Sequence, residues 1–314
     1  MVFIRSMVRP GSLASGSAFR AALKPNHSLL RSRSRLFSSA TTTPVELQYD
    51  ELIPADGNKT DKPLVILHGL FGSKRNWLSL SKAFMKDLQR PIYTLDLRNH
   101  GDSPHAAPMD YPAMAADVLH FFEQRGLSNI SLLGHSMGGK VAMAVALSPA
   151  LSQDALTNLI VADIAPSRGD LSPEFRGYVE GMKKIMVAKV GTRKEAQAIL
   201  TEYEQDASIR AFLLTNIALP TPATPHIHFR IPVPLIGDSM AHIGGFPYEA
   251  GHATWEGRAM FIKGTKSRYI NTRNVALTKE YFPNMVLEEL DASHWVHAEK
   301  PNEFKKLVTD FIHA

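Results

Sequence analysis

Short apolar runs alternate with longer amphipathic stretches along the first half of the chain. The runs have the length and uniform hydrophobicity of strands buried on both faces, and they cover residues 63–69, 91–97, 130–136 and 156–166. The stretches between them are predicted as helices, at 76–88, 111–126 and 138–148. In the first of these, Trp77, Leu80 and Phe84 follow spacings of three and four, which place them on one helix face. Strand alternating with helix predicts a mostly parallel sheet with helices on both faces.

This alternation stops after Pro166. We interpret about residues 167–250 as a mainly helical insertion, a lid, between two strands of the sheet. The chain after the insertion is predicted to supply two strands and a final amphipathic helix, at 258–264, 283–290 and 301–312. Residues 45–314 then form one domain.

Cap residues predict where helices of the insertion begin and end. Ser172 followed by Pro173 is typical of a helix start, because serine caps free amide groups and proline fits the first helical position. Gly191 is predicted to end that helix. Thr192 and Glu195 form a capping-box pattern, which predicts the start of a second helix.

The positive charge of the chain is concentrated at its beginning. Residues 1–45 contain seven arginines and lysines and no acidic residue, which leaves 28 basic and 30 acidic residues in the rest. An arginine- and serine-rich segment without acids is typical of a transit peptide, and Arg35 two residues before Phe37 resembles a mitochondrial processing site. We therefore predict a transit peptide over residues 1–37 and a location in the mitochondrial matrix. A disordered basic tail with a surface role is the alternative.

Composition argues against several classes of function. The near-neutral body of the chain gives no reason to expect a nucleic-acid partner. No apolar stretch reaches the roughly 18–20 residues that span a bilayer, so no integral membrane segment is expected. The chain has no cysteine, which excludes a thiolate nucleophile. His226 and His228 are spaced for chelation, but no acid or third histidine stands near them in sequence, and no metal site is predicted.

Ser136 lies at the centre of a nucleophile-elbow pattern. The sequence Gly134-His135-Ser136-Met137-Gly138 follows an apolar strand and precedes a predicted helix, which is the setting that a G-x-S-x-G elbow requires. The glycines are explained by neighbouring backbone that passes too close for a side chain. We predict that Ser136 is a nucleophile, with its hydroxyl exposed at the carboxyl end of the sheet.

A serine hydroxyl needs a base to remove its proton. In elbow architectures that base comes last in the chain, on the loop after the final strand, where His294 and His297 both stand. We predict His294 as the base, and we expect His297 to pack against the terminal helix. His68 and His100 are expected to brace loops beside the site.

The carboxylate that orients the base is less obvious. The expected aspartate after the strand at 258–264 is missing, because residues 264–274 contain no acid. Asp163 ends the preceding strand and can reach the same place, so we predict that it completes a Ser-His-Asp triad. Asp291 is the weaker alternative.

An attacked carbonyl becomes an oxyanion, which needs amide donors held in advance. The backbone NH of Met137 follows the nucleophile directly and is the first predicted donor. The second should come from a loop after an early strand, where Leu70 follows His68 and Gly69.

These motifs resemble those of a known group. The segments "HGLFGSKRNW", "LDLRNHGDSPH", "GHSMGGKVAM", "ADIAP" and "SHWVHAEKP" are similar to the α/β-hydrolase superfamily, and within it to the mitochondrial group of abhydrolase domain-containing protein 11 and the yeast-type ethanol acetyltransferases. The resemblance covers about residues 45–314. It implies an α/β-hydrolase fold with a lid, a triad of Ser136, Asp163 and His294, and cleavage of short acyl esters or thioesters.

The expected substrate is therefore a small ester, thioester or alcohol, and no cofactor is expected. The resemblance further implies that acetyl-CoA can act as an acyl donor to an alcohol. Dehalogenases and epoxide hydrolases share this architecture but use a carboxylate nucleophile where Ser136 stands. The alternative from another class is a catalytically dispensable protein that stabilises a mitochondrial enzyme complex. The sequence leaves the protein partners unidentified.

Overall fold

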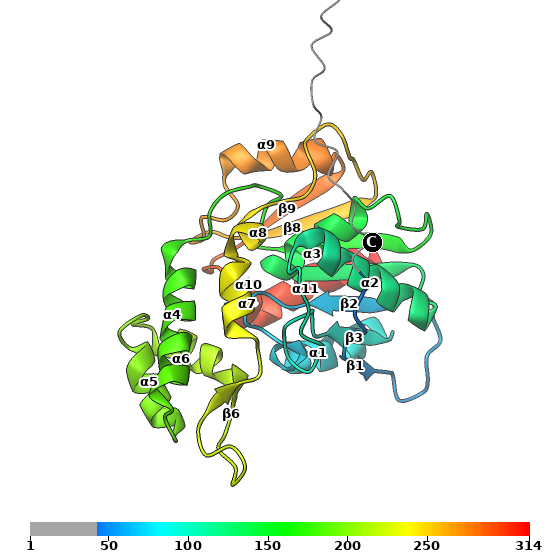
Figure 1. Ribbon diagram of the computed structural model, residues 1–314. Helices are drawn as coiled ribbons and strands as arrows, with labels where there is room; N and C mark the ends of the chain where they lie inside the picture. Colours follow the sequence, from blue (N-terminus) through cyan, green and yellow to red (C-terminus); the bar gives the residue numbers. More distant parts are fainter. Residues whose placement is uncertain (1–42) are drawn as a thin grey trace, which may run out of the picture. The chain divides into compact units, whose positions relative to one another are not determined.

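The computed structural model describes residues 43–314 and has a sheet at its centre (Figure 1). The sheet has seven strands. In chain order, its strands are β1 (Tyr49–Leu52), β2 (Leu64–Leu67), β3 (Ile92–Leu95), β4 (Ile130–His135), β5 (Leu156–Ala162), β8 (Arg258–Gly264) and β9 (Met285–Leu290). They pair in the order β1-β3-β2-β4-β5-β8-β9, and β1 alone runs antiparallel to its neighbour. The carboxyl ends of the six parallel strands share one edge, so the loops that follow them meet there.

Helices cover both faces of the sheet. The helices outside the insertion are the 3-10 helix η1 (Lys74–Trp77), α1 (Leu78–Leu88), α2 (Tyr111–Arg125), α3 (Met137–Ala146), α9 (Thr272–Tyr281), α10 (Val296–Glu299) and α11 (Pro301–His313). Helices α1 and α11 pack on one face, where Phe84 and Phe304 are buried. Helices α2 and α3 pack on the other, where Phe121 and Val141 are buried. The fold is thus an α/β architecture with a mostly parallel sheet, as predicted.

The segment between β5 and β8 is built mainly of helices (Figure 1). Its elements are α4 (Pro173–Ala188), α5 (Arg193–Leu200), α6 (Ala207–Leu213), the 3-10 helix η2 (Leu214–Asn216), β6 (Ile217–Ala218), β7 (His228–Phe229), α7 (Val233–Asp238) and α8 (Met240–Gly244). We call residues 167–250 the insertion. Met182, Ile185 and Leu200 are fully buried between its helices. The small antiparallel pair β6–β7 was not expected from the sequence.

The helix caps of the insertion agree with the sequence pattern in two places and differ in one. Helix α4 begins at Pro173 directly after Ser172, as predicted, but the Ser172 side chain makes no cap hydrogen bond. The Thr192 hydroxyl accepts from the Glu195 amide, and the Glu195 carboxylate accepts from the Thr192 amide. The prediction that Gly191 ends α4 is wrong. The helix ends at Ala188, because Lys189 itself adopts a left-handed conformation with φ 52°.

Two predictions concern membranes and targeting. Among residues 43–314, no helix has both the length and the apolar character needed to cross a bilayer. The predicted transit peptide, residues 1–37, lies outside the residues that the structure describes and stays a prediction.

Candidate active site

Ser136 occupies the turn between β4 and α3 in a strained backbone conformation, with φ 52° and ψ −120°. Such a conformation is rare for residues other than glycine. The flanking glycines permit it. A Cβ on Gly134 would lie 2.2 Å from the Gly138 carbonyl oxygen, and a Cβ on Gly138 would lie 2.5 Å from the carbonyl oxygens of Leu67 and His68. The predicted steric reason for these glycines is therefore confirmed.

The structure brings Ser136, His294 and Asp163 into one hydrogen-bonded chain. His294 Nε2 lies 2.9 Å from Ser136 Oγ, and His294 Nδ1 lies 2.8 Å from Asp163 Oδ2. An ionised carboxylate only accepts hydrogen bonds, so Nδ1 carries the imidazole proton and Nε2 is free to accept from the serine hydroxyl. The Asp163 side chain is completely buried and that of His294 is 15% exposed.

Asp163 is held in place by the strand next to its own. It follows β5 with φ 50°, and its Oδ1 accepts a hydrogen bond of 2.9 Å from the Gly264 amide at the end of β8. The segment that lacks the expected aspartate thus provides a backbone donor to Asp163. Asp291, the weaker alternative, is exposed and pairs with Lys266 at 2.9 Å. It is not the carboxylate that contacts His294.

His297 packs where the sequence predicted. Its ring stacks on Trp77 at 4.4 Å between centroids and lies edge-on to Phe304 of α11. Burial lowers the pKa of His297 to about 3, so the ring is neutral. It has no hydrogen-bond contact with Ser136 and does not compete with His294 for that role.

His68 and His100 brace loops, as expected. His68 Nε2 accepts from the Leu97 amide at 3.0 Å, and His100 Nε2 accepts from the Phe71 amide at 3.1 Å. Burial lowers the pKa of both rings, that of His100 to about 3. Both therefore remain neutral, with one ring nitrogen available as an acceptor.

The amides predicted as oxyanion donors belong to Met137, which follows Ser136 in the chain, and to Leu70, which lines a cavity beside Ser136. Met137 is the first residue of α3, so its amide has no acceptor within the helix. Leu70 precedes Phe71, which takes a left-handed conformation with φ 62°. That strained residue is held from two sides, because His100 accepts from its amide and the Asn216 side chain donates to its carbonyl at 2.8 Å. Asn216 belongs to the insertion, and no pattern in the sequence connects it with this loop.

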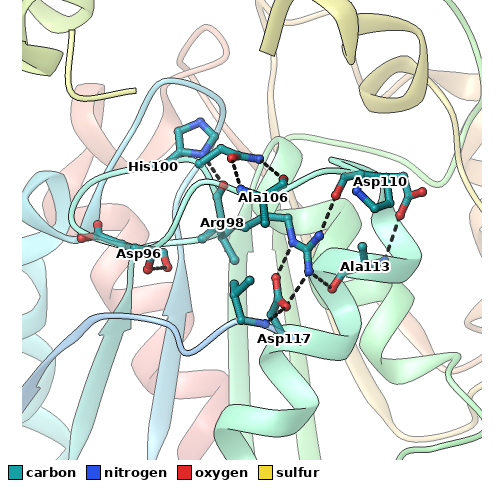
Figure 2. A network of polar contacts seen from close by, with 12 residues as sticks. Asp96, Arg98, His100, Ala106, Asp110, Ala113 and Asp117 are labelled. Carbon is teal, nitrogen blue, oxygen red and sulfur yellow. Dashed lines mark hydrogen bonds and ion pairs between the residues drawn. The ribbon is translucent and has the colours of Figure 1, made fainter. Parts of the chain in front are cut away.

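An ion pair anchors the loop that carries His100. Arg98 donates to both carboxylate oxygens of Asp117 at 2.6 Å and to the Pro108 carbonyl at 2.6 Å, with both charged side chains completely buried (Figure 2). Burial raises the pKa of the Asp117 carboxyl, and the Arg98 guanidinium opposes that rise. The pair fixes the loop from which His100 reaches Phe71.

Two further buried residues contact this site and were not identified from the sequence. His135 Nε2 lies 2.9 Å from the carbonyl oxygen of His294, and burial holds the pKa of His135 well below its usual range. A neutral ring that contacts a carbonyl oxygen must donate to it, so His135 holds the backbone of His294.

Lys140 donates to the carbonyls of Ser167, Gly244 and Gly245 at 2.8–3.0 Å. Burial lowers the Lys140 pKa to about 8. The sequence pattern that could have indicated a structural role for Lys140 is its position in an otherwise apolar helix.

A cavity of about 410 Å³ opens beside Ser136 and His294. Its walls come from the loop after β2, from the loop after β9 and from helices α4 and α6 of the insertion, with Phe175, Phe212 and Trp295 among the lining side chains. This is the size of site that holds small organic molecules. Within residues 43–314, no group of three or more histidine, aspartate and glutamate side chains is arranged to hold a metal ion.

The chain belongs to the α/β-hydrolase fold family, whose sequence pattern it matches over residues 62–301. It is 36% identical to the sn-1-specific diacylglycerol lipase ABHD11 of Danio rerio, over 88% of this chain and 85% of the relative. It is 32% identical to ethanol acetyltransferase 1 of Wickerhamomyces anomalus, over 85% of this chain and 74% of the relative. Among solved structures, a marine microorganism esterase is 34% identical with a TM-score of 0.76, over 85% of this chain and 99% of the esterase chain.

Proposed function

We propose that this protein is a serine hydrolase that cleaves short-acyl carboxylic esters or thioesters through an acyl-serine intermediate. The observation that carries the proposal is the hydrogen-bonded chain from Ser136 through His294 to Asp163 at the carboxyl edge of the sheet. Similarity to an esterase, to a lipase and to an acetyltransferase supports acyl transfer as the reaction class.

The proposed reaction begins when Ser136 Oγ attacks the acyl carbonyl carbon. The hydroxyl proton moves to His294 Nε2, and a bond forms between Oγ and the carbon. Asp163 stabilises the imidazolium that results. The carbon–oxygen or carbon–sulfur bond to the leaving group then breaks, and His294 returns the proton to the departing heteroatom. An acyl ester of Ser136 remains.

The amides of Met137 and Leu70 are proposed to bind the negative oxygen of each tetrahedral intermediate. Met137 supports this role because it begins α3, whose positive dipole end faces the carboxyl edge of the sheet. Leu70 supports it because it lines the cavity beside Ser136. Preorganised donors of this kind contribute about 3–4 kcal/mol each to catalysis.

A second molecule releases the acyl group from Ser136. Water as acceptor gives a carboxylic acid, and a small alcohol gives a new ester; His294 removes the acceptor's proton in both cases. The acetyltransferase relative supports the alcohol, and the lipase and esterase relatives support water. In this proposal acetyl-CoA is a substrate that donates its acyl group, and the reaction requires no cofactor.

Labelling with a fluorophosphonate tests the nucleophile. The purified protein is expected to become labelled at Ser136, whereas Ser136→Ala is expected to stay unlabelled and to lose roughly 10³-fold or more in turnover. Ser131, which is buried in β4, supplies the matched Ser131→Ala control and should retain labelling. Equal labelling of wild type and Ser136→Ala would contradict the proposal. So would a Ser136→Ala protein that keeps its cellular effect, which is what a stabilising protein without catalysis predicts.

Product analysis with acetyl-CoA and ethanol in one reaction separates the two acceptors. Acetate indicates hydrolysis and ethyl acetate indicates transfer, and both are expected to disappear in Ser136→Ala. Formation of neither product would remove acetyl-CoA from the proposed substrates.

We further propose that the protein acts in the mitochondrial matrix. The proposal rests on the acid-free, arginine-rich segment that precedes the hydrolase domain. Residues 1–45 fused to a fluorescent reporter should direct it to mitochondria, and a diffuse cytosolic signal would contradict this.

A further inference from the structure

Two cavities, not one, meet at Ser136. The second has a volume of about 100 Å³ and lies between α3, α8 and the start of the insertion. Both cavities are lined by Leu70, Ser136, Phe175 and Tyr269. The serine therefore stands at the boundary between a large and a small cavity, and the two parts of an ester can lie on opposite sides of it.

The residues that line only one of the two cavities indicate which part of a substrate that cavity holds. His294 lines the large cavity only, and Met137 lines the small one only. The leaving heteroatom must lie within hydrogen-bond reach of His294, because it receives the proton from Nε2. The alcohol or thiol part therefore belongs in the large cavity. The acyl chain, on the other side of the attacked carbon, then extends past Met137 into the small one.

We propose that the small cavity is the acyl-binding site and that its size restricts the substrate to short acyl chains. This inference rests on the proposed function and assigns the acyl part of its substrate to one of the two cavities. An apolar cavity of about 150 Å³ holds a benzene molecule with its six carbons, so about 100 Å³ corresponds to acyl chains of roughly two to four carbons. The large cavity places no comparable limit on the alcohol or thiol.

The wall of the small cavity is held by side chains that leave it little freedom to expand. The Tyr111 hydroxyl, which is buried, donates to the Ile243 carbonyl at 2.7 Å. The Lys140 ammonium binds the carbonyls of Gly244 and Ser167 at 3.0 and 2.8 Å. These bonds tie α8 and the start of the insertion to α2 and α3. A wall fixed in this way predicts a sharp upper limit of acyl length.

Two series of esters test the proposal with the wild-type protein. One series keeps the alcohol constant and lengthens the acyl chain from acetyl to octanoyl; the other keeps acetyl and lengthens the alcohol over the same range. We expect kcat/KM to fall about 10-fold or more between butyryl and hexanoyl, because one excess methylene in a fixed pocket costs about 10-fold or more. The alcohol series should vary far less. A reversed pattern, or equal tolerance in both series, would overturn the assignment.

A matched pair of variants then tests each wall. Ile243→Ala removes apolar volume from a residue that lines only the small cavity, and Ile209→Ala makes the same change in the large one. Ile243→Ala is expected to extend the accepted acyl chain by about one or two carbons, since the cavity gains the space of the lost side chain. Ile209→Ala should change the alcohol profile and leave the acyl profile unaltered. An acyl limit that moves in Ile209→Ala and not in Ile243→Ala would contradict the proposal.

The outcomes separate this inference from the proposed function. If the protein neither turned over esters nor became labelled by the fluorophosphonate, the proposed hydrolase activity would be contradicted. If labelling and turnover were present but acyl length had no upper limit, only the assignment of the small cavity as the acyl-binding site would be contradicted. Ile243 is buried, so Ile164→Val, a smaller change in the same wall, replaces Ile243→Ala if that variant does not fold.

Discussion

At the scale of single residues, His294 is fixed at three points. Its two ring nitrogens contact Ser136 and Asp163, and its backbone carbonyl accepts from His135. His135 occupies the variable position just before the nucleophile, so the elbow itself holds the loop that carries the proposed base. This contact ties the backbone of the proposed base to the residue next to the nucleophile, and we infer that His135 is a positioning residue.

The proposed role of Asp163 can be tested by replacing it with asparagine, and the same replacement at Asp291 is the control. Asp163→Asn keeps the size of the side chain but can donate to Nδ1, which favours the wrong imidazole tautomer. We expect kcat to fall by roughly 10³- to 10⁴-fold with KM little changed. Steady-state kinetics on one short-chain ester measures this. Asp291→Asn, at the exposed carboxylate paired with Lys266, should keep wild-type kcat, and a comparable loss there would contradict the assignment.

At the scale of elements, the insertion does more than cover the cavity. Asn216 is the last residue of the 3-10 helix η2, and its side chain reaches a carbonyl 145 positions earlier in the chain. The contact supports Phe71 in its left-handed conformation and so orients the adjacent amide of Leu70. We infer that the insertion helps to set the geometry of the proposed oxyanion donors.

Asn216→Leu tests this link. The variant leaves the Phe71 carbonyl without its donor, and a small displacement of the Leu70 amide should lower kcat about 10-fold while KM changes little. Thr215→Val is the control, because it removes a hydrogen bond within the insertion, from Thr215 to Phe212, that does not involve the loop. A fall in kcat together with a rise in KM, alike in both variants, would indicate general loosening of the insertion and would contradict a positioning role.

The buried Arg98–Asp117 pair anchors the neighbouring loop, from which His100 contacts Phe71 (Figure 2). Arg98→Met leaves a buried carboxylate uncompensated, and we expect it to lower the free energy of unfolding by about 3–5 kcal/mol. The double variant Arg98→Met, Asp117→Leu removes both charges and should recover part of that loss. Urea unfolding measures both values. A double variant less stable than Arg98→Met would show that the pair's main contribution is not mutual compensation of charge.

Two of the elements that sequence patterns missed have little apolar signal. Strand β1 reads Tyr-Asp-Glu-Leu and joins the sheet edge through backbone pairing with β3, and helix α9 begins at a cap on Asn271 and carries few buried residues. Ser136, His294 and Asp163 could be predicted because chain order and strand ends place them at one edge. The contact from Asn216 to Phe71 could not, because it depends on how the insertion folds back over the sheet.

At the scale of the whole described domain, four neutral histidines lie at the carboxyl edge of the sheet. His68, His100, His135 and His297 are all buried, and burial lowers the pKa of each below the value of an exposed histidine. Each is neutral in the folded protein at pH values where the unfolded chain binds a proton. Folding therefore disfavours protonation of these four side chains, which lie at the same edge of the sheet as the proposed triad.

This group of histidines predicts acid instability with a defined sign. The folded-state pKa lies below the unfolded value of 6.5, so each histidine leaves stability intact above pH 6.5 and lowers it as the pH falls toward the folded pKa. The slope is about 1.4 kcal/mol per pH unit for each histidine. His100 and His297, whose pKa values fall to about 3, together cost about 6 kcal/mol two pH units below 6.5, which is comparable to a typical stability of about 5–15 kcal/mol. The lowered pKa values of His68 and His135 act in the same direction. Circular dichroism against pH should therefore show unfolding well above pH 3. His297→Phe keeps an aromatic ring against Trp77 and removes one of the buried histidines. The lost Nδ1 has no hydrogen-bond partner. The acid unfolding of this variant should therefore occur at lower pH than that of the wild type. The exposed His313→Phe is the control, and a transition that moves equally in both variants would exclude burial as the cause.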